Sequence, residues 1–385
     1  MFIRKKCCIS SLILPDRAGY EDKWKYLFLR WKSGKLIIEQ MKKVVLTGIR
    51  EMTLINDNIP RITKPNEVKI KLKSIGVCGS DIHYYSEGKI GTQVVEYPFP
   101  VGHECSGVIE ETGPDVTRVK KGDLVVVDPA VHCGHCDQCL SGRPHTCRNN
   151  RFLGCPGQLD GCLAEYIVMP DFTCFPVTEK LNPVQAALIE PLSIGVYAVN
   201  LAALTGTGVS AAIFGAGPIG LSILMKLLAD GIHRVGVIEP LEYRLEKAKN
   251  IGAQYLINPN KENVFSQVSQ HEELLPDVVF EASGEQDAVD HSLEILKPGG
   301  KLVLVGIPPS AAYTFNMDIM RRKEINVINV RRQNHCVEEA INLVVNGKVD
   351  VEKMVTHHFS LDETPLAFDM VEGYKNGVIK AMIDL

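Results

Sequence analysis

The pattern of hydrophobic and polar positions changes character near the middle of the 385-residue chain. Residues 68–72 read Val-Lys-Ile-Lys-Leu, an alternation typical of a strand with one buried face. Short strand patterns bounded by glycine, proline and aspartate continue to about residue 180. The first half of the chain is therefore predicted to be mostly β.

From residue 209 strand patterns alternate with helix patterns, which indicates a parallel sheet with crossover helices. The expected strands are 209–214, 234–238, 277–281 and 301–305, and the expected helices are 218–230 and 241–251. Beyond residue 326 the pattern is less regular, and one more helix is expected near 336–346.

The first 40 residues differ from the rest of the chain. Both tryptophans, Trp24 and Trp31, lie there, together with nine Lys/Arg against four Asp/Glu. We interpret residues 1–40 as an N-terminal extension outside the fold, because a clean strand pattern begins at Met41. A signal peptide is the alternative: a basic start precedes a short apolar run, but no small-residue cleavage site follows.

Composition and charge exclude several classes of protein. The chain is 45% hydrophobic and 23% charged, as soluble globular proteins are. A net charge of −4 gives no reason to expect nucleic acid or a membrane as a partner. Beyond residue 40 no apolar run approaches the roughly 18 residues of a membrane helix. Twelve cysteines are too few for a disulfide scaffold, and their clustering indicates metal ligation in a reducing compartment, hence the cytoplasm.

A glycine-rich turn, Gly215-Ala216-Gly217-Pro218-Ile219-Gly220, follows an expected strand and opens an expected helix. Glycine allows the tight turn, the close approach of a pyrophosphate and the packing of helix on strand. Glu239 ends the next strand, where a carboxylate binds ribose hydroxyls and repels a 2′-phosphate. Arg244 could bind such a phosphate but lies in the helix behind Glu239, so NAD is favoured over NADP. A ligand-free glycine turn beside an exposed glutamate is the alternative.

Four cysteines lie close together in a segment rich in turn-forming residues. Two, two and seven residues separate them, a spacing that can close a tetrahedral zinc site. Four thiolates leave no open position, so this metal would be structural. Buried or disulfide-bonded cysteines are the alternative. The members of the group are Cys133, Cys136, Cys139 and Cys147; the interleaved His132, His135 and His145 are spare ligand candidates or solvated loop residues.

A second metal site is indicated by residues that are far apart in the sequence. Cys78 lies in one glycine-containing segment, and His103 and Glu104 lie in another. Glu190 is an acid within an apolar stretch, where a buried carboxylate needs a partner. Cysteine, histidine and carboxylate together form a catalytic zinc site that keeps one position open.

With these motifs the chain resembles the zinc-containing medium-chain alcohol dehydrogenases from Met41 to its end. The stretch Gly102-His103-Glu104-x-x-Gly107, with Gly113 and Val116, matches their signature. Within the family it is similar to sorbitol dehydrogenase and related polyol dehydrogenases, through His83-Tyr84-Tyr85, Gly88-Lys89-Ile90-Gly91 and Glu190-Pro191-Leu192-Ser193.

The resemblance implies an α/β fold in which a Rossmann-type, doubly wound parallel sheet accompanies a mostly β, GroES-like catalytic domain. Residues 41–192 and 330–385 would form the zinc-binding catalytic domain, and 193–329 the NAD-binding domain. Two zinc ions per chain are implied, and a homotetramer or homodimer is expected.

The resemblance also implies roles for individual residues. Cys78, His103 and Glu104 would bind the catalytic zinc, and Glu190 would be a fourth ligand or hold the zinc-bound water. Ser80 would receive the substrate proton and His83 would pass it to water. Arg331 matches a substrate-site arginine, and Tyr84, Phe152 and Leu153 line the pocket or belong to the core. Arg332 departs from the pattern, because an aromatic residue is usual there.

The predicted function is transfer of hydride from a secondary hydroxyl of a sugar alcohol to NAD. Arg331 and Arg332 would offer many donors to such a substrate. A threonine dehydrogenase-like enzyme is the alternative, although that subfamily usually has threonine at the position of Ser80. A non-enzymatic zinc-binding NAD sensor would be expected to lack Cys78, His103 or Ser80, and all three are present.

We predict that a chain starting at Met41 folds and turns over as the full chain does, because no motif lies upstream. Soluble yield, thermal unfolding and turnover of the truncated protein test this. Loss of soluble protein would show that Trp24 or Trp31 packs against the body of the protein.

Overall fold

The computed structural model describes residues 31–32, 35–36, 40–177, 179–309 and 312–385. Its contacts divide the chain into two compact units, residues 1–39 and 40–385. In the first unit the described residues form an antiparallel pair, β1 (Trp31–Lys32) and β2 (Lys35–Leu36). The rest of the expected extension, with Trp24 and the alternative signal peptide, lies outside the described residues.

A seven-stranded sheet forms the first half of the larger unit around the central strand β5 (Glu67–Gly76). On β5, Val68, Ile70 and Leu72 are buried, as their alternation predicts. The strand order is β13-β9-β8-β5-β21-β20, with β12 also paired to β5. The bounds are β8 (Glu104–Thr112), β9 (Leu124–Val127), β12 (Tyr166–Pro170), β13 (Cys174–Pro176), β20 (Val355–Ser360) and β21 (Lys380–Asp384).

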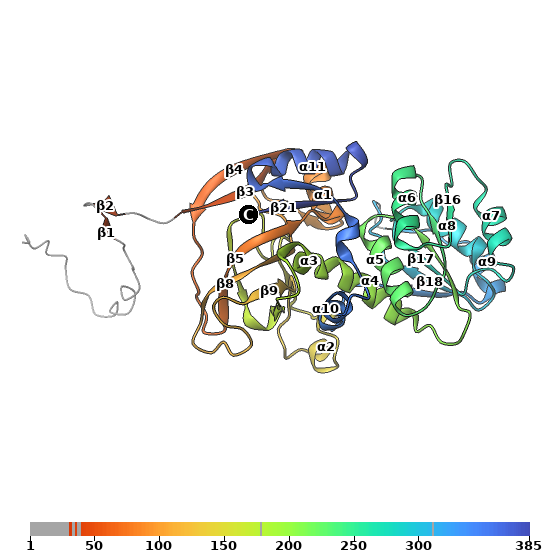
Figure 1. Cartoon of the computed structure of the whole chain (residues 1–385), viewed down its shortest axis with the longest axis horizontal. Coiled ribbons are helices and arrows are strands. Elements are labelled where there is room, and N and C mark those ends of the chain that lie inside the picture. The colour runs from red at the N-terminus through yellow and green to blue at the C-terminus, as the bar shows by residue number, and fades with distance from the viewer. Residues whose placement is uncertain (1–30, 33–34, 37–39, 178, 310–311) are drawn as a thin grey trace, which may run out of the picture. The chain divides into compact units, whose positions relative to one another are not determined.

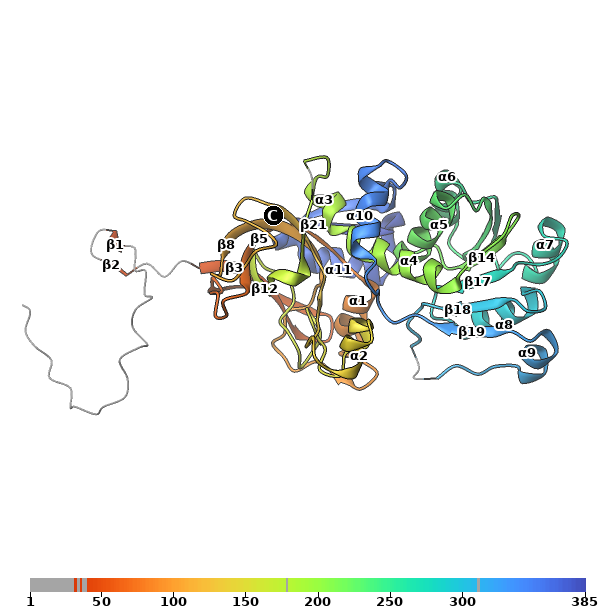
Figure 2. The same cartoon turned by 90° about the horizontal axis from the view of Figure 1, so that it is seen from below.

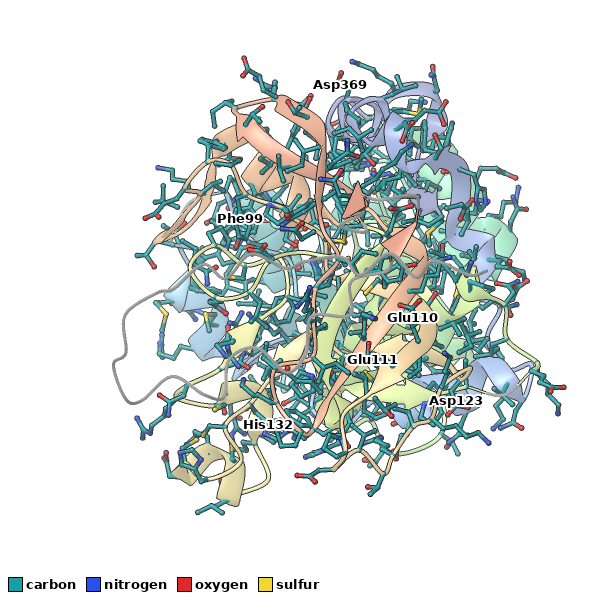
Figure 3. All side chains as sticks on the ribbon, turned by 90° about the vertical axis from the view of Figure 1, so that its left-hand side faces the viewer. Phe99, Glu110, Glu111, Asp123, His132 and Asp369 are labelled. Atoms are coloured by element: carbon teal, nitrogen blue, oxygen red, sulfur yellow. The ribbon has the colours of Figure 1, made fainter. Side chains whose placement is uncertain are left out.

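The last strand of the chain completes this first sheet. β21 runs antiparallel to β5 and parallel to β20. On the polar face of the sheet, Lys69 of β5 pairs with Glu110 at 3.6 Å and with Glu111 at 2.7 Å, both on β8 (Figure 3). Of the polar positions of the alternating pattern, Lys69 thus forms ion pairs with the neighbouring strand and Lys71 lies over the ring of Tyr166, while the apolar positions enter the core.

A second sheet contains six parallel strands in the order β16-β15-β14-β17-β18-β19. Numbered along the chain this order is third, second, first, fourth, fifth, sixth, which is the dinucleotide-binding arrangement. The prediction of a Rossmann-type sheet beside a mostly β domain is confirmed. The strands are β14 (Ser210–Phe214), β15 (Arg234–Ile238), β16 (Tyr255–Ile257), β17 (Val278–Glu281), β18 (Lys301–Leu304) and β19 (Asn326–Asn329).

Helices cover both faces of the second sheet (Figures 1 and 2). Successive residues of one strand enter different cores: Ile213 packs in the cluster that includes α4, α5, α6 and α10, and Phe214 in the cluster that includes α7 and α8. A sheet buried on both faces reads as a continuous apolar run, as the segment Ala211-Ala212-Ile213-Phe214 does. The helices are α4 (Ile189–Ala202), α5 (Pro218–Ala229), α6 (Glu242–Ile251), α7 (Val264–His271), α8 (Gln286–Ile295) and α10 (Val337–Val345).

The expected helix near 336–346 is present as α10. The pattern analysis missed β16, which has only three residues, and α7 and α8, which are short helices. The remaining elements are β3 (Gln40–Gly48), β4 (Glu51–Asn58), β6 (Lys89–Ile90), β7 (Gln93–Val94), β10 (Ala130–Val131), β11 (Arg151–Phe152), α1 (Gly79–Glu87), α2 (Asp137–Leu140), α3 (Pro183–Ala187), α9 (Met317–Lys323) and α11 (Thr364–Glu372).

Within the part of the chain that the structure describes, no helix combines the length and the apolar character that crossing a membrane requires. The domain boundaries expected at 192/193 and 329/330 remain predictions, because the contacts divide the chain only between residues 39 and 40.

Candidate active site

The four predicted cysteines of the loop come together in space. The sulfurs of Cys133, Cys136, Cys139 and Cys147 all lie within 4.8 Å of one another. The separation is 3.6 Å between Cys136 and Cys139, 3.9 Å between Cys136 and Cys147, and 3.5 Å between Cys147 and Cys133. Four sulfurs around one tetrahedral zinc, each at about 2.3 Å, would lie about 3.8 Å apart. The donor set and its spacing therefore fit a zinc ion, and none of the described cysteines forms a disulfide.

Local backbone hydrogen bonds lower the pKa of two of these thiols, Cys133 and Cys136, whereas burial raises the pKa of Cys139. The backbone N–H of His135 lowers the pKa of Cys133 to about 6, which favours the thiolate that a metal requires. The interleaved histidines have other partners. His135 Nδ1 lies 2.8 Å from the Cys133 carbonyl, His145 Nε2 lies 3.1 Å from the Tyr197 hydroxyl, and His132 packs on Phe172 (Figure 3). All three lie outside the sulfur group.

A second group contains one ligand atom each from Cys78, His103 and Glu104, all within 4.8 Å of one another. The fold of the first sheet creates this group. Strand β5 ends at Gly76, opposite Glu104 at the start of β8. Cys78 then caps the N-terminus of α1, so the end of one strand and the start of its neighbour converge. Sulfur, imidazole and carboxylate in this arrangement could hold one metal ion with an open position.

Asp81, in the first turn of α1, forms hydrogen bonds with both segments that supply the metal group, the segment of Cys78 and the segment of His103. One carboxylate oxygen accepts hydrogen bonds from the Gly102 N–H at 3.1 Å and from His103 Nδ1 at 3.2 Å. The other accepts the N–H of Cys78 at 3.2 Å. A carboxylate on Nδ1 leaves Nε2 of the imidazole for a metal. Burial disfavours the imidazolium, but the negative charges of Asp81 and Cys78 raise the pKa of His103 well above its usual range.

Lys380 of β21 is wholly buried and forms an ion pair with Glu104. Its ammonium also donates to the Val77 carbonyl at 3.0 Å. Burial alone would lower the pKa of Lys380, but the charge of Glu104 helps to raise it above its usual value. Gly76 makes room for the pair, because a Cβ there would lie 2.1 Å from Glu104 Oε2. The sequence analysis missed both Lys380 and Asp81; the spacing of Asp81 three residues after Cys78 was the one local signal.

Glu190 is buried in the first turn of α4 and interacts electrostatically with His103, Glu104 and Lys380. Burial raises the pKa of its carboxyl group to about 8. Its oxygens are not among the atoms that lie within 4.8 Å of one another in the described metal group. The carboxyl group is therefore near this group but outside its tight cluster.

The predicted proton relay is partly assembled. The Ser80 hydroxyl donates to Cys78 Sγ at 3.4 Å, which places it beside the metal group. His83 lies one turn further along α1 and is partly exposed, with Nδ1 at 3.0 Å from Glu87 Oε1. Among the described contacts, no hydrogen bond joins Ser80 to His83, so a transferred proton needs a bridging hydroxyl or water.

The predicted pocket residues differ in burial. Tyr84 is buried and its hydroxyl donates to Gln93 at 3.1 Å, and the Phe152 ring lies 5.3 Å from the imidazole of His103. Arg331 is exposed, whereas the neighbouring Arg332 is partly buried and covers Phe152. Leu153 belongs to the hydrophobic core of the first sheet. The substrate roles of the two arginines remain predictions.

The glycine turn has the geometry that a pyrophosphate needs. Gly215 has a φ of +91°, which L side chains rarely adopt, and Gly217 caps the N-terminus of α5. A Cβ on Gly220 would lie 1.9 Å from the Gly215 carbonyl oxygen. Pro218 and Ile219 open the helix, where the missing N–H of proline is tolerated. Free N–H groups and the helix dipole at this end would bind a phosphate.

Glu239 follows β15 and lies almost wholly buried beside the glycine turn. Its carboxylate accepts the N–H of Ala216 at 2.8 Å and the N–H of Leu241 at 3.0 Å. Arg244 of α6 lies 3.9 Å from it. The acid thus fixes the turn and keeps spare lone pairs for ribose hydroxyls, while Arg244 is drawn toward the acid.

Comparisons with known proteins agree with this site. Residues 64–179 match the alcohol dehydrogenase GroES-like domain, and residues 218–346 match the zinc-binding dehydrogenase domain. The chain is 35% identical to sorbitol dehydrogenase of Bacillus subtilis over 346 residues, which are 90% of this chain and 97% of the relative. It is 29% identical to L-idonate 5-dehydrogenase of Vitis vinifera, over 92% and 97% of the two chains.

A solved structure, galactitol-1-phosphate dehydrogenase from Escherichia coli, superposes with a TM-score of 0.83 at 28% identity, over 90% of this chain and 100% of that one. The chain belongs to the zinc-containing medium-chain alcohol dehydrogenase family. Its cofactors are zinc and a nicotinamide dinucleotide, consistent with solved relatives that hold NADP or NADH.

We predict two zinc ions per chain in the metallated protein. Cys136→Ser should remove one ion and lower the unfolding temperature, because three thiolates remain around an unfilled site. Cys78→Ser should remove the other ion and abolish turnover with little loss of stability. Elemental analysis with thermal unfolding measures both, and Cys336→Ser serves as a control that keeps two ions. One ion or none in the unsubstituted protein would contradict the two-site assignment.

We also predict that Glu239→Ala weakens NAD binding by about 10- to 100-fold, the loss expected for hydrogen bonds to a charged group. Discrimination against NADP should relax, because the repulsion of the 2′-phosphate disappears. Titration followed by the fluorescence of the reduced cofactors, NADH and NADPH, measures both dissociation constants. Glu246 is an exposed acid on α6, the helix that follows Glu239, and the Glu246→Ala protein should bind NAD as the unsubstituted protein does. A preference of the unsubstituted enzyme for NADP would overturn this role of Glu239.

Proposed function

We propose that the protein oxidises a secondary hydroxyl of a sugar alcohol and transfers the hydride to NAD. The observation that carries this proposal is the convergence of Cys78, His103 and Glu104 within 4.8 Å, with the Ser80 hydroxyl 3.4 Å from Cys78 Sγ. Relatives whose names give sorbitol, L-idonate and galactitol 1-phosphate as substrates support a polyol. We expect a homodimer or homotetramer in the cytoplasm.

The side chains of the metal group have separate tasks in this proposal. Cys78, His103 and Glu104 would hold zinc, and the four-cysteine loop would hold the second, structural ion. When bound, zinc would polarise the substrate hydroxyl and the nicotinamide would accept the hydride. Glu190, buried next to the group but outside its cluster, would orient a water or the substrate by a hydrogen bond. Lys380 would limit the negative charge of the donor set by neutralising Glu104.

Proton removal is the task of α1. Ser80 lies beside the metal group and would take the hydroxyl proton of the substrate. A water or a cofactor hydroxyl would pass it to His83, which is partly exposed and can release it to solvent. Glu87 accepts a hydrogen bond from His83 and would stabilise the imidazolium during the transfer.

The glycine turn at 215–220 and Glu239 would fix the cofactor. The backbone of residues 215–220 would bind the pyrophosphate, and Glu239 would bind the adenosine ribose. Arg244 lies near both Gly217 and Glu239. Because its guanidinium approaches the carboxylate, it would not be free to hold a 2′-phosphate, and this favours NAD.

A panel of alcohols with NAD tests the proposal. Sorbitol, xylitol, galactitol, an inositol and charged polyols are compared with L-threonine and ethanol by the appearance of NADH. We expect kcat/KM for at least one polyol to exceed the values for threonine and ethanol by about 100-fold or more. A substrate without the matching hydroxyls would leave the hydrogen-bond donors of the substrate site buried and unpaired. Cys78→Ser is the inactive control. Preference for threonine or ethanol over every polyol would refute the proposal.

A further inference from the structure

Arg332 presents a cation close to the metal group. Its guanidinium carbon lies 3.6 Å from the centre of the Phe152 ring, stacked on one face of that ring. The Phe152 ring in turn lies 5.3 Å from the imidazole of His103. One aromatic ring therefore separates the guanidinium from a candidate metal ligand, and Arg332 also interacts electrostatically with Tyr84 and Glu190.

The guanidinium is partly buried, and one of its nitrogens lacks an acceptor. Arg332 Nη1 is buried and has no hydrogen-bond partner, and no ion pair of Arg332 occurs among the described residues. The carboxylate of Asp128 attracts Arg332 electrostatically but forms no hydrogen bond or ion pair with it among the described contacts. The two oxygens of Asp128 accept the Ala130 N–H at 3.0 Å and the Gln333 side-chain amide at 2.8 Å. A buried charged donor left unpaired is costly, and such a group is usually satisfied by a ligand.

The backbone around Arg332 is held in an unfavourable conformation. Arg332 has a φ of +54° and His335, three residues later, has a φ of +56°. A non-glycine residue in this region is strained, and such strain concentrates at ligand sites. Arg331 is exposed, whereas Arg332 is partly buried and lies over Phe152. The cation of Arg332 is therefore held over Phe152 by a strained backbone.

We propose that Arg332 selects a polyol that carries an anionic group, a carboxylate or a phosphate, over a neutral sugar alcohol. This inference rests on the proposed polyol dehydrogenase function. A planar guanidinium with free N–H donors matches the paired oxygens of a carboxylate or phosphate and binds them more strongly than it binds hydroxyls. Stacking on Phe152 fixes the plane of the guanidinium, so that less freedom is lost when the anion binds.

Three substrates with the same six-carbon skeleton test the inference: sorbitol, gluconate and sorbitol 6-phosphate. They are assayed with NAD on the unsubstituted enzyme and on Arg332→Gln, Arg332→Lys and Arg322→Gln. We expect kcat/KM for one of the two anions to exceed that for sorbitol at least tenfold, and the better anion identifies the recognised group. Arg332→Gln should lower kcat/KM for that anion at least thirtyfold, mainly through KM, and change the value for sorbitol less than threefold. Arg332→Lys should retain part of the selectivity.

Arg322→Gln is the matched control and should keep the full preference for the anion, because Arg322 is an exposed arginine of α9 with no role in the proposed site. Thermal unfolding and NAD affinity of each variant confirm that the fold is retained. Oxidation of sorbitol in preference to both anions would refute the role of Arg332 and leave the proposed function standing. An equal loss for all three substrates in Arg332→Gln would also refute it, as a packing effect. If no polyol is oxidised at all, the proposed function fails and the inference fails with it.

Discussion

The buried ion pair between Lys380 and Glu104 connects the fold to the chemistry. The two residues are 276 positions apart in the sequence, and both are shielded from water. Removing one partner of such a pair costs about 3–5 kcal/mol, because the other charge is left buried and alone. The pair therefore fixes β21 against the end of β5, where Gly76 leaves the space that the two side chains fill.

The same constraint shapes the donor group around it. Glu104 offers a carboxylate to the metal group while Lys380 offsets its charge, and Asp81 holds Cys78 and His103 from the other side. Every donor atom is thus oriented by a neighbour that is itself buried. Such preorganisation lets a metal bind without rearranging the side chains around it.

Most of what could be predicted from the sequence is what local spacing determines; the group of Cys78, His103 and Glu104 was predicted instead from donor chemistry and family resemblance. The glycine turn at 215–220, the four-cysteine loop and the alternating strand at 68–72 each depend on residues that are close in the chain. The ion pair of Lys380 could not be predicted, because its partner comes from the other end of the chain. The position of Arg332 over Phe152 could not be predicted either, because the two residues are far apart in the sequence.

The position of β21 also bears on how the protein is made. A ribosome completes strands β5, β8, β9 and β12 long before residue 380 is synthesised, and domains generally begin to fold in that order. Until the C-terminal strand arrives, the edge of β5 lacks its partner and Glu104 lacks its counter-charge. Contacts of such high sequence separation form late and slowly. The nascent chain can therefore complete its cysteine loop and its nucleotide-binding sheet early, whereas Glu104 gains its counter-charge only once residue 380 has been synthesised.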